Sequence, residues 1–118
     1  MDPAAQIPLN PRDYLILFSL ISEERHGYGI VKRVEHDSLG QVSLDPANLY
    51  RAIKRLIRDG LVAESDERPT EESGGQKRRY YSITEFGREV IALEAARLAA
   101  LADAARAEHL IPGSESRR

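Results

Sequence analysis

Four cationic side chains recur at spacings of three and four residues within the stretch 45–60. They are Arg51, Lys54, Arg55 and Arg58. At 100° per residue they share one face of a helix, and the opposite face is apolar. The apolar residues are Leu49, Ala52, Ile53, Leu56 and Ile57. A helix that is anchored on one side and cationic on the other can bind the phosphates of a nucleic acid. The alternative is a solvated charged face without a ligand.

Both ends of this helix are marked in the sequence. Asp45 can cap the first turn, Pro46 suits the first helical position, and Gly60 can end the helix in a left-handed conformation. Asn48 lies in the first turn, where two roles are open. It can form hydrogen bonds at the start of the helix, or it can make a bidentate contact with N6 and N7 of an adenine.

A second cationic cluster lies in a predicted β-hairpin. It comprises Lys77, Arg78 and Arg79. The two β-prone runs of the hairpin cover residues 61–65 and 78–83, and Gly74-Gly75 supplies turn chemistry between them. The segment from Glu64 to Glu72 holds five acidic residues and one arginine. Phosphate should repel this tip of the hairpin, so it is not expected to insert deeply into a groove of DNA.

The elements before the hairpin are predicted to be helical. Asn10 followed by Pro11 marks a helix start, and an apolar segment continues to about Glu24. A second short helix ends near Asp37, and residues 41–44 alternate like a brief strand. Three helices followed by a hairpin form a winged helix-turn-helix, so the predicted fold class is α+β, mostly α. In that fold the third helix fits the major groove of DNA and the hairpin lies along the backbone or the minor groove.

A long last helix is predicted from Glu85, capped by Thr84, to about Leu110. Nine of the sixteen residues from 92 to 107 are alanine, the best helix former. At 1.5 Å per residue the helix would be about 39 Å long, longer than a compact domain of this size needs. A stripe at three- and four-residue spacing therefore predicts a partner helix from a second copy of the chain. This stripe comprises Ile91, Ala95, Leu98, Leu101, Ala102 and Ala105.

The 118 residues suit one domain, and the formal net charge is −2, so any affinity for nucleic acid must come from local patches. We expect a flexible tail over residues 1–9, a winged helix-turn-helix over 10–83, a dimerisation helix over 84–111 and a disordered tail over 112–118. The start lacks an apolar signal core, and the longest apolar run is too short to cross a bilayer. The chain contains no cysteine. The expected location is the cytoplasm, with no membrane partner.

Catalysis and metal binding are not expected. The three histidines, His26, His36 and His109, lie far apart, with no carboxylate or cysteine at the spacing of metal ligands. No glycine-rich phosphate loop opens a helix, and no nucleophile is paired with a base. The sequence predicts no enzyme activity, no catalytic residues and no cofactor.

Three segments together resemble the PadR family of bacterial transcription regulators. They are HGYGI, LYRAIKRLIRDGLV and RRYYSITEFG, in this order and spacing. The resemblance covers about residues 12–110, and the single terminal helix is similar to the shorter PadR subfamily. It implies a homodimer assembled through the first and last helices. It also implies binding to a near-palindromic operator in double-stranded DNA, usually as a repressor that a small molecule or another signal releases.

The resemblance also implies roles for single residues. His26, Gly27 and Tyr28 match the opening of the second helix and are expected to be structural. Leu49 and Tyr50 match a Leu-Tyr pair in the recognition helix, with Leu49 in the core and the Tyr50 hydroxyl able to meet a phosphate. The match to the second strand of the wing covers Lys77, Arg78, Arg79 and Tyr80. The chain departs from the family where Ala47 and Asn48 replace Gly and Ser or Thr.

Tyr14 and Phe18, one turn apart on the first helix, have two possible roles. They can belong to the core, or they can form an effector pocket with Leu98 near the two-fold axis, where the family tends to bind planar aromatic ligands. Offset stacking would favour a planar hydrophobic small molecule there. A second function class also stays open, a winged-helix protein-interaction module without DNA binding. The acidic wing and the sequence pI of ≈ 5.9 favour it, whereas the cationic helix face favours DNA.

Overall fold

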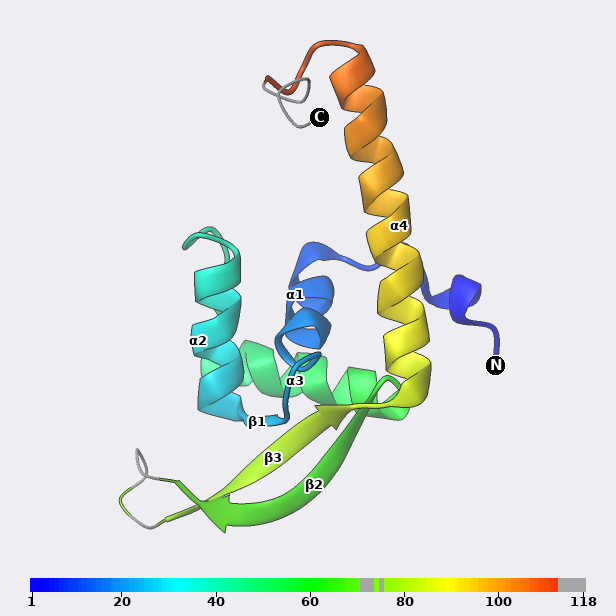
Figure 1. The fold of residues 1–118 in the computed structure, drawn as a ribbon. Coiled ribbons are helices and arrows are strands. Elements are labelled where there is room, and N and C mark those ends of the chain that lie inside the picture. Colours follow the sequence, from blue (N-terminus) through cyan, green and yellow to red (C-terminus); the bar gives the residue numbers. More distant parts are fainter. Residues whose placement is uncertain (71–73, 75, 113–118) are drawn as a thin grey trace.

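The computed structural model of the chain describes residues 1–70, 74 and 76–112. The elements in chain order are η1 (Pro3–Gln6), α1 (Pro11–Ser19), β1 (Arg25–His26), α2 (Gly27–Asp37), α3 (Pro46–Arg58), β2 (Val62–Pro69), β3 (Lys77–Ile83) and α4 (Glu85–Ala107). The predicted fold class, an α+β and mostly α winged helix, is confirmed (Figure 1). Glu71, Glu72 and Gly75 of the predicted wing tip and residues 113–118 of the predicted tail lie outside the described residues.

The helices begin where side chains cap them. Asp45 Oδ1 accepts a hydrogen bond from the Asn48 backbone N–H at 2.8 Å, and Gly60 follows α3 with φ +82°. The predicted bounds of α3 are therefore confirmed. In the same way Asn10 Oδ1 accepts from the Asp13 N–H at 2.8 Å and starts α1. α1 lies between α2 and α4, and α3 runs across beneath it (Figure 1).

Two predictions about the first half of the chain are wrong. α1 ends at Ser19 and not near Glu24, where the backbone carbonyl of Ser19 accepts a hydrogen bond from Arg25 Nε at 2.6 Å. Residues 41–44 form no strand, because the Val42 N–H is used locally, by Ser38 Oγ at 2.9 Å. The extra strand is β1 instead, which pairs antiparallel with β3 and gives the sheet order β1-β3-β2.

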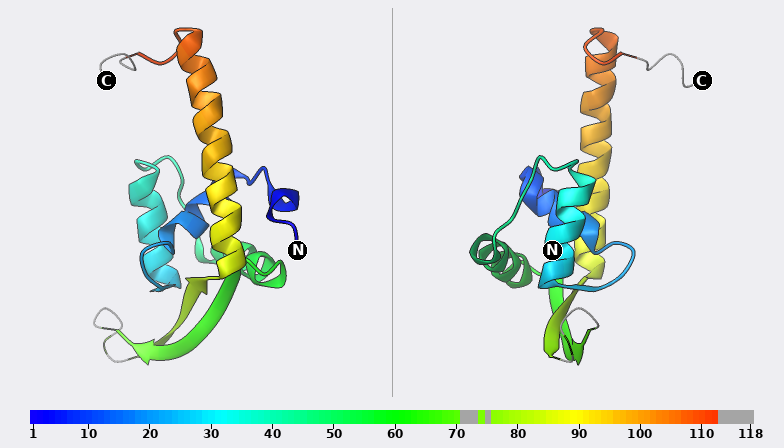
Figure 2. Two further views of the ribbon diagram at one scale, coloured as in Figure 1. Left: turned by 45° about the vertical axis from the view of Figure 1, so that its right-hand side comes forward. Right: turned by 90° about the vertical axis from the view of Figure 1, so that its left-hand side faces the viewer.

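The hairpin is longer than the sequence suggests, because β2 continues to Pro69. β2 and β3 are antiparallel, from the pair Val62–Ile83 to the pair Pro69–Lys77, with an irregularity between Glu64 and Glu67. The hairpin curves away beneath the helices, at the end of the molecule opposite the free end of α4 (Figure 2).

The hairpin and α4 are joined by a close backbone contact. The Thr84 N–H donates to the Leu61 carbonyl at 3.1 Å, and the Thr84 Oγ1 accepts from the Gly87 N–H at 2.9 Å. A Cβ atom at Gly87 would lie 2.3 Å from the Leu61 carbonyl oxygen. Only glycine fits here, so the start of α4 is fixed against the end of α3.

Residues 1–9, which the sequence predicts to be a flexible tail, are packed. η1 lies against α4, and Ile7 and Leu9 pack against the core. The Leu9 N–H donates at 2.9 Å to Oε2 of Glu94, a carboxylate that is only 1% exposed. Hydrogen bonds from the Arg97 guanidinium hold the pKa of Glu94 below its ordinary value, against the effect of burial. The N-terminal segment is therefore attached to α4 through one charged group.

α4 has two halves with different surroundings. Its buried residues are Gly87, Val90, Ile91 and Glu94. Ile91, which its spacing places on the dimer stripe, is 5% exposed and belongs to the core of its own chain. Beyond Glu94 the helix projects past the domain, with Leu98 38% and Leu101 55% exposed (Figure 2). It ends at Ala107 and not near Leu110.

Candidate nucleic-acid interface

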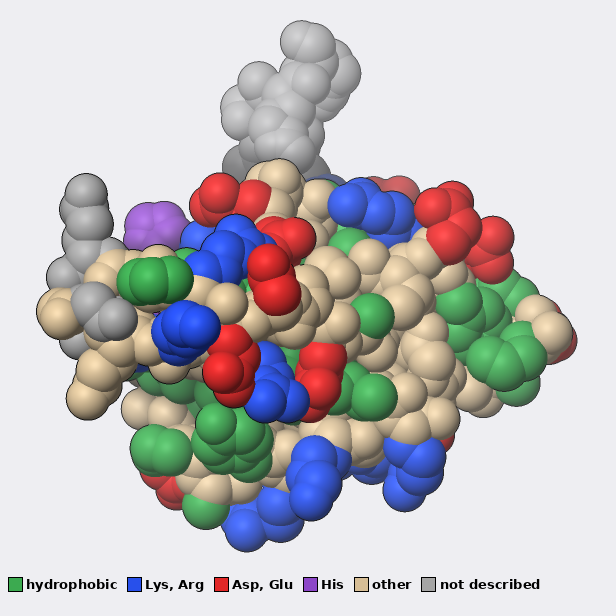
Figure 3. Space-filling view, turned by 90° about the horizontal axis from the view of Figure 1, so that it is seen from below, with side chains coloured by type: hydrophobic (Ala, Val, Ile, Leu, Met, Phe, Trp, Pro, Cys, Tyr) green, Lys and Arg blue, Asp and Glu red, His purple; other side chains and the backbone are tan. Residues whose placement is uncertain are grey.

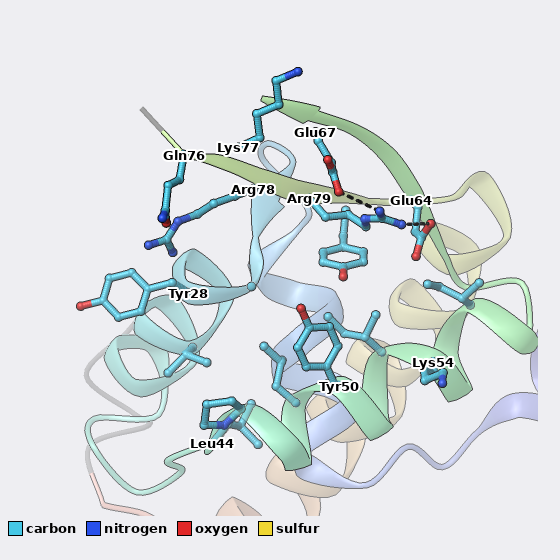
Figure 4. Close-up of a pocket in the computed structure, with 17 residues that line it drawn as sticks. Tyr28, Leu44, Tyr50, Lys54, Glu64, Glu67, Gln76, Lys77, Arg78 and Arg79 are labelled. Carbon is cyan, nitrogen blue, oxygen red and sulfur yellow. Dashed lines mark hydrogen bonds and ion pairs between the residues drawn. The ribbon is translucent and has the colours of Figure 1, made fainter. Parts of the chain in front are cut away.

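An open groove of ≈ 890 Å³ lies between α3, the start of α2 and the hairpin. Apolar side chains of α2 and α3 line its floor, and charged side chains of α3, β2 and β3 line its rim (Figure 4). The predicted DNA-contact residues that line it are Tyr50, Lys54, Lys77, Arg78 and Arg79. Two elements that are distant in the sequence thus bring cations to one concave surface.

The outer face of α3 presents exposed cations. Arg51 and Lys54 are exposed, and Lys54 has no ion-pair partner among the described residues. Arg58 is 70% exposed and lies 3.1 Å from Asp59. Three of the four predicted cations therefore point outward, as the spacing indicates.

The fourth cation, Arg55, is held inside the chain. Its Nη2 lies 2.6 Å and 2.5 Å from the two carboxylate oxygens of Asp13 on α1. The Asp13 side chain is 9% exposed and that of Arg55 32% exposed. Arg55 thus links α3 to α1 and does not project freely into solvent. The sequence offered one signal for this pair, an isolated carboxylate in an otherwise apolar helix.

The side-chain amide of Asn48 is already bonded within α3. Its Nδ2 donates to Asp45 Oδ2 at 3.0 Å, and its Oδ1 accepts from Arg51 Nη2. The structure therefore shows the helix-start role of Asn48. A bidentate contact with adenine would have to replace both hydrogen bonds. Arg51 is oriented by the same amide, at the end of α3 that would enter a groove of DNA.

Acidic side chains of the hairpin neutralise one predicted contact residue, Arg79. Its Nη1 donates to Glu64 Oε1 at 3.0 Å and its Nη2 to Glu67 Oε2 at 2.8 Å (Figure 4). The hydrogen bond from Arg79 holds the pKa of Glu67 below its ordinary value. The same bond raises the pKa of Arg79. In this geometry Arg79 offers little net charge to a phosphate.

Arg68, on the partner strand, is neutralised in the same way. It pairs with Asp66 at 3.1 Å and with Glu24. Its Cζ lies 3.9 Å from the ring centroid of Tyr80. Tyr80 is half-buried and also meets the His26 ring edge-on at 5.4 Å. Tyr80, predicted as a DNA contact, thus packs between β1 and β2.

Tyr80 and its neighbour Tyr81 face opposite sides of β3, as the alternation of a strand predicts. Tyr81 is 3% exposed in the core, where burial raises its pKa. Tyr50, on α3, is 58% exposed and directs its hydroxyl toward the hairpin across the groove (Figure 4). A phosphate lying in the groove could accept a hydrogen bond from the Tyr50 hydroxyl.

Two hairpin cations make no ion pair with a carboxylate among the described residues. Lys77 is exposed and points away from the groove floor (Figure 4). The Arg78 Cζ lies 5.6 Å from the ring centroid of Tyr28, which is 50% exposed at the start of α2. Seen from below, basic and acidic side chains are interspersed over this face (Figure 3). Within the described chain, the predicted contact cations without a carboxylate partner are Arg51, Lys54, Lys77 and Arg78.

The aromatic pair on α1 is formed as the one-turn spacing predicts. The rings of Tyr14 and Phe18 lie 6.1 Å apart and 10° from parallel. Phe18 is 39% exposed, so the pair is only partly covered by its own chain. Leu98, the third residue of the predicted effector pocket, is exposed on α4. A closed pocket between them would need a second chain.

The residues that the structure describes form neither a metal site nor a membrane span. No three or more His, Cys, Asp or Glu side chains there form a group that could hold a metal ion. In the same residues no helix is long and apolar enough to cross a membrane.

Solved structures share this architecture. A PadR family transcription regulator from Clostridium difficile aligns with a TM-score of 0.67 at 23% identity, over 80% of this chain and 94% of that chain. A transcriptional regulator from Clostridium thermocellum gives 0.64 at 23% identity, over 80% and 86%. PadR of Bacillus subtilis, solved in complex with operator DNA, gives 0.56 at 22% identity, over 72% of this chain and 46% of that one. At these identities the likeness is one of fold.

Sequence comparison identifies the family. A curated but uncharacterized protein of Lysinibacillus sphaericus is 28% identical over 76 residues, which cover 64% of this chain and 67% of the relative. The model of the transcriptional regulator PadR-like family matches residues 16–93, more than half of the chain. This match includes α2, α3 and the hairpin, the elements that form the groove. The chain belongs to the PadR-like family of transcriptional regulators.

Proposed function

We propose that this chain binds operator DNA as a homodimer and acts as a transcriptional repressor that a small molecule or another signal releases. The observation that carries the proposal is a set of four cations on α3 and β3, the elements on either side of the groove, that make no ion pair with a carboxylate of the described residues. They are Arg51, Lys54, Lys77 and Arg78. Membership of a family of transcriptional regulators supports it. So does the B. subtilis relative that was solved with operator DNA.

The proposed docking follows from the shape of the groove. An α-helix with its side chains is about 10–12 Å across, close to the width of the major groove of B-DNA. With α3 in the major groove, Arg51 would face base edges near the start of the helix. Lys54 would lie beside one strand of the backbone, and Lys77 and Arg78 would approach the backbone from the hairpin. Arg55 and Arg79 would contribute through the fold and not through phosphate contacts.

The proposed dimer follows from the projecting half of α4. Its apolar face continues the face that packs on the core, but none of its residues beyond Glu94 is buried. The residues left for a partner are Ala95, Leu98, Leu101, Ala102 and Ala105. A second copy related by a two-fold axis would cover this face with the same surface. Two recognition helices would then meet half-sites about 34 Å apart on a near-palindromic operator.

The proposed release uses the aromatic pair on α1. In a dimer the exposed ring of Phe18, its neighbour Tyr14 and Leu98 would line an apolar gap near the two-fold axis. A planar hydrophobic molecule bound there shifts operator affinity only if it prefers one spacing of the two recognition helices. Titration of planar aromatic compounds against the wild type and a Tyr14→Ala/Phe18→Ala double variant tests this. Equal binding to both proteins, or binding without change in operator affinity, would move the signal site elsewhere.

Selection of duplexes from a random DNA library with the purified protein tests the core of the proposal. We expect a near-palindrome. If Lys54, Lys77 and Arg78 of each subunit contact phosphates, the slope of log affinity against log salt should be about −5 for the dimer. An Arg51→Ala/Lys54→Ala variant should lose the selected sequence. If no sequence is enriched and affinity ignores salt, the winged helix would be a protein-interaction module instead.

A further inference from the structure

Tyr28 is an exposed aromatic residue in a position where the core does not need it. It is the second residue of α2, and half of its surface is accessible. Two cations from different elements approach its ring. Lys32 Nζ, one turn later on α2, lies 5.4 Å from the ring centroid, and Arg78 Cζ, from β3, lies 5.6 Å from it. One cation of α2 and one of the hairpin thus lie within cation–π range of the same ring.

The surroundings of Arg78 differ from those of the other arginines in the hairpin. Arg68 and Arg79 are each held by two carboxylates. Arg78 makes no ion pair with a carboxylate among the described residues, and neither does Lys32. Two cations that share one ring repel each other, and the ring quadrupole offsets this only partly. An anion placed between them would remove the repulsion.

The geometry also limits which anion fits. Tyr28 and Arg78 line the rim of the groove on the α2 side (Figure 4). Lys54 of α3 lines the other side of that groove (Figure 4). A strand of DNA backbone that follows the groove past α3 would pass between the start of α2 and β3. The anion expected at this point is a phosphodiester of that strand.

We propose that Tyr28 is a positioning residue that holds Lys32 and Arg78 as a clamp for one backbone phosphate of the operator. This inference rests on the proposed DNA-binding function and extends it. The sequence predicts a structural role for Tyr28 and none for Lys32, because the clamp arises only when β3 lies beside α2. The ring restricts two long side chains to one region before DNA arrives, so less freedom is lost on binding.

The test is a salt series of operator binding by fluorescence anisotropy, with the full chain. Lys32→Gln and Arg78→Gln should each weaken binding and make the slope of log affinity against log salt shallower. The double variant should make it shallower by about 1.8 for the dimer, because the two cations share one phosphate in each subunit. Arg88→Gln is the matched control, because it removes an exposed cation of α4 that bonds the Ile21 carbonyl and lies outside the groove. It should leave the slope unchanged.

The role of the ring is tested separately. Tyr28→Leu should weaken binding several-fold, and Tyr28→Phe should recover most of that loss because it restores the ring. In the Arg78→Gln background, Tyr28→Leu should weaken operator binding much less than it does in the wild type, since the two residues act together. If Tyr28→Phe is as weak as Tyr28→Leu, the hydroxyl and not the ring makes the contact, and the clamp is refuted. If circular dichroism shows that Tyr28→Leu is unfolded, the salt slopes of Lys32→Gln and Arg78→Gln decide whether the clamp exists.

Two further outcomes separate the clamp from the general proposal. If Arg51→Ala/Lys54→Ala abolishes binding but Lys32→Gln and Arg78→Gln keep the wild-type slope, DNA binding stands and the clamp fails. If the wild type binds no duplex, the proposed function itself fails. Millimolar inorganic phosphate at constant ionic strength should not compete with the operator. Competition that Lys32→Gln removes would assign the site to free phosphate and overturn the backbone assignment.

Discussion

The ion pair between Asp13 and Arg55 gives the sharpest test of how the recognition helix is held. Arg55→Met keeps most of the aliphatic stem but removes the guanidinium, and so leaves the buried Asp13 carboxylate with only Arg12, whose Nε lies 3.9 Å from Asp13 Oδ1. Breaking a fully buried pair costs about 3–5 kcal/mol, and breaking an exposed pair at most about 1 kcal/mol. Asp13 is 9% exposed and Arg55 32% exposed, so the pair lies between these limits. We expect a loss of about 2 kcal/mol.

That loss should be visible by thermal denaturation. For a chain of this size, 1 kcal/mol corresponds to about 4 °C near the midpoint, so the melting temperature should fall by roughly 8 °C. Asp13→Ala should cost a similar amount. The double variant should cost clearly less than the sum, because no unpaired charge remains. Additive losses would show that the two side chains do not interact in solution.

Measurements of operator binding distinguish a structural role of Arg55 from a contact between Arg55 and a phosphate. If Arg55 only positions α3, Arg55→Met should weaken operator binding while the salt slope stays unchanged. If Arg55 leaves Asp13 to contact a phosphate, the slope should become shallower by about 1.8 for the dimer. A shallower slope with an unchanged melting temperature would refute the structural role.

Three further predictions concern the wing, the close contact of α4 and the dimer. Glu64→Gln/Glu67→Gln should free Arg79, so non-specific duplex binding should strengthen and its salt slope should steepen by about 1.8. Gly87→Ala should destabilise the fold by about 1–3 kcal/mol in denaturant titrations, since its Cβ would lie 2.3 Å from a backbone carbonyl. Leu98→Glu should give a monomer in sedimentation and abolish operator binding, whereas a tight dimer would place the interface elsewhere.

The parts of the fold that the sequence predicts well are those that local signals specify. α3 begins after Asp45 and ends before Gly60, because a cap and a left-handed glycine act within one turn. The alternation of Tyr80 and Tyr81 follows in the same way from the period of a strand. The two-residue strand β1 carries no such signal. Its existence depends only on β3 passing beside Arg25 and His26.

In the candidate interface too, local spacing predicts which face a charge lies on, but contacts between distant segments decide whether that charge is paired. Spacing alone places Arg51, Lys54 and Arg55 on one helix face, but it cannot show that Arg55 meets a carboxylate 42 residues earlier. Arg79 belongs to a basic run in the sequence, yet the register of β3 on β2 sets it against Glu64 and Glu67. Charge counts along a sequence therefore overestimate the cations available to DNA wherever a hairpin brings acids alongside them.

The first helix connects the surfaces that the proposed function requires. Asp13 holds the recognition helix through Arg55, and the next residue, Tyr14, belongs to the ring pair proposed to face the effector. Just before α1, the Leu9 N–H donates to Glu94, the last buried residue before α4 projects beyond the domain. A rotation of α1 at the two-fold axis would thus move Asp13 and, with it, α3. If the proposed effector displaces the Tyr14–Phe18 pair, the change would reach α3 through the partly buried ion pair between Asp13 and Arg55 and so alter the spacing of the two α3 helices.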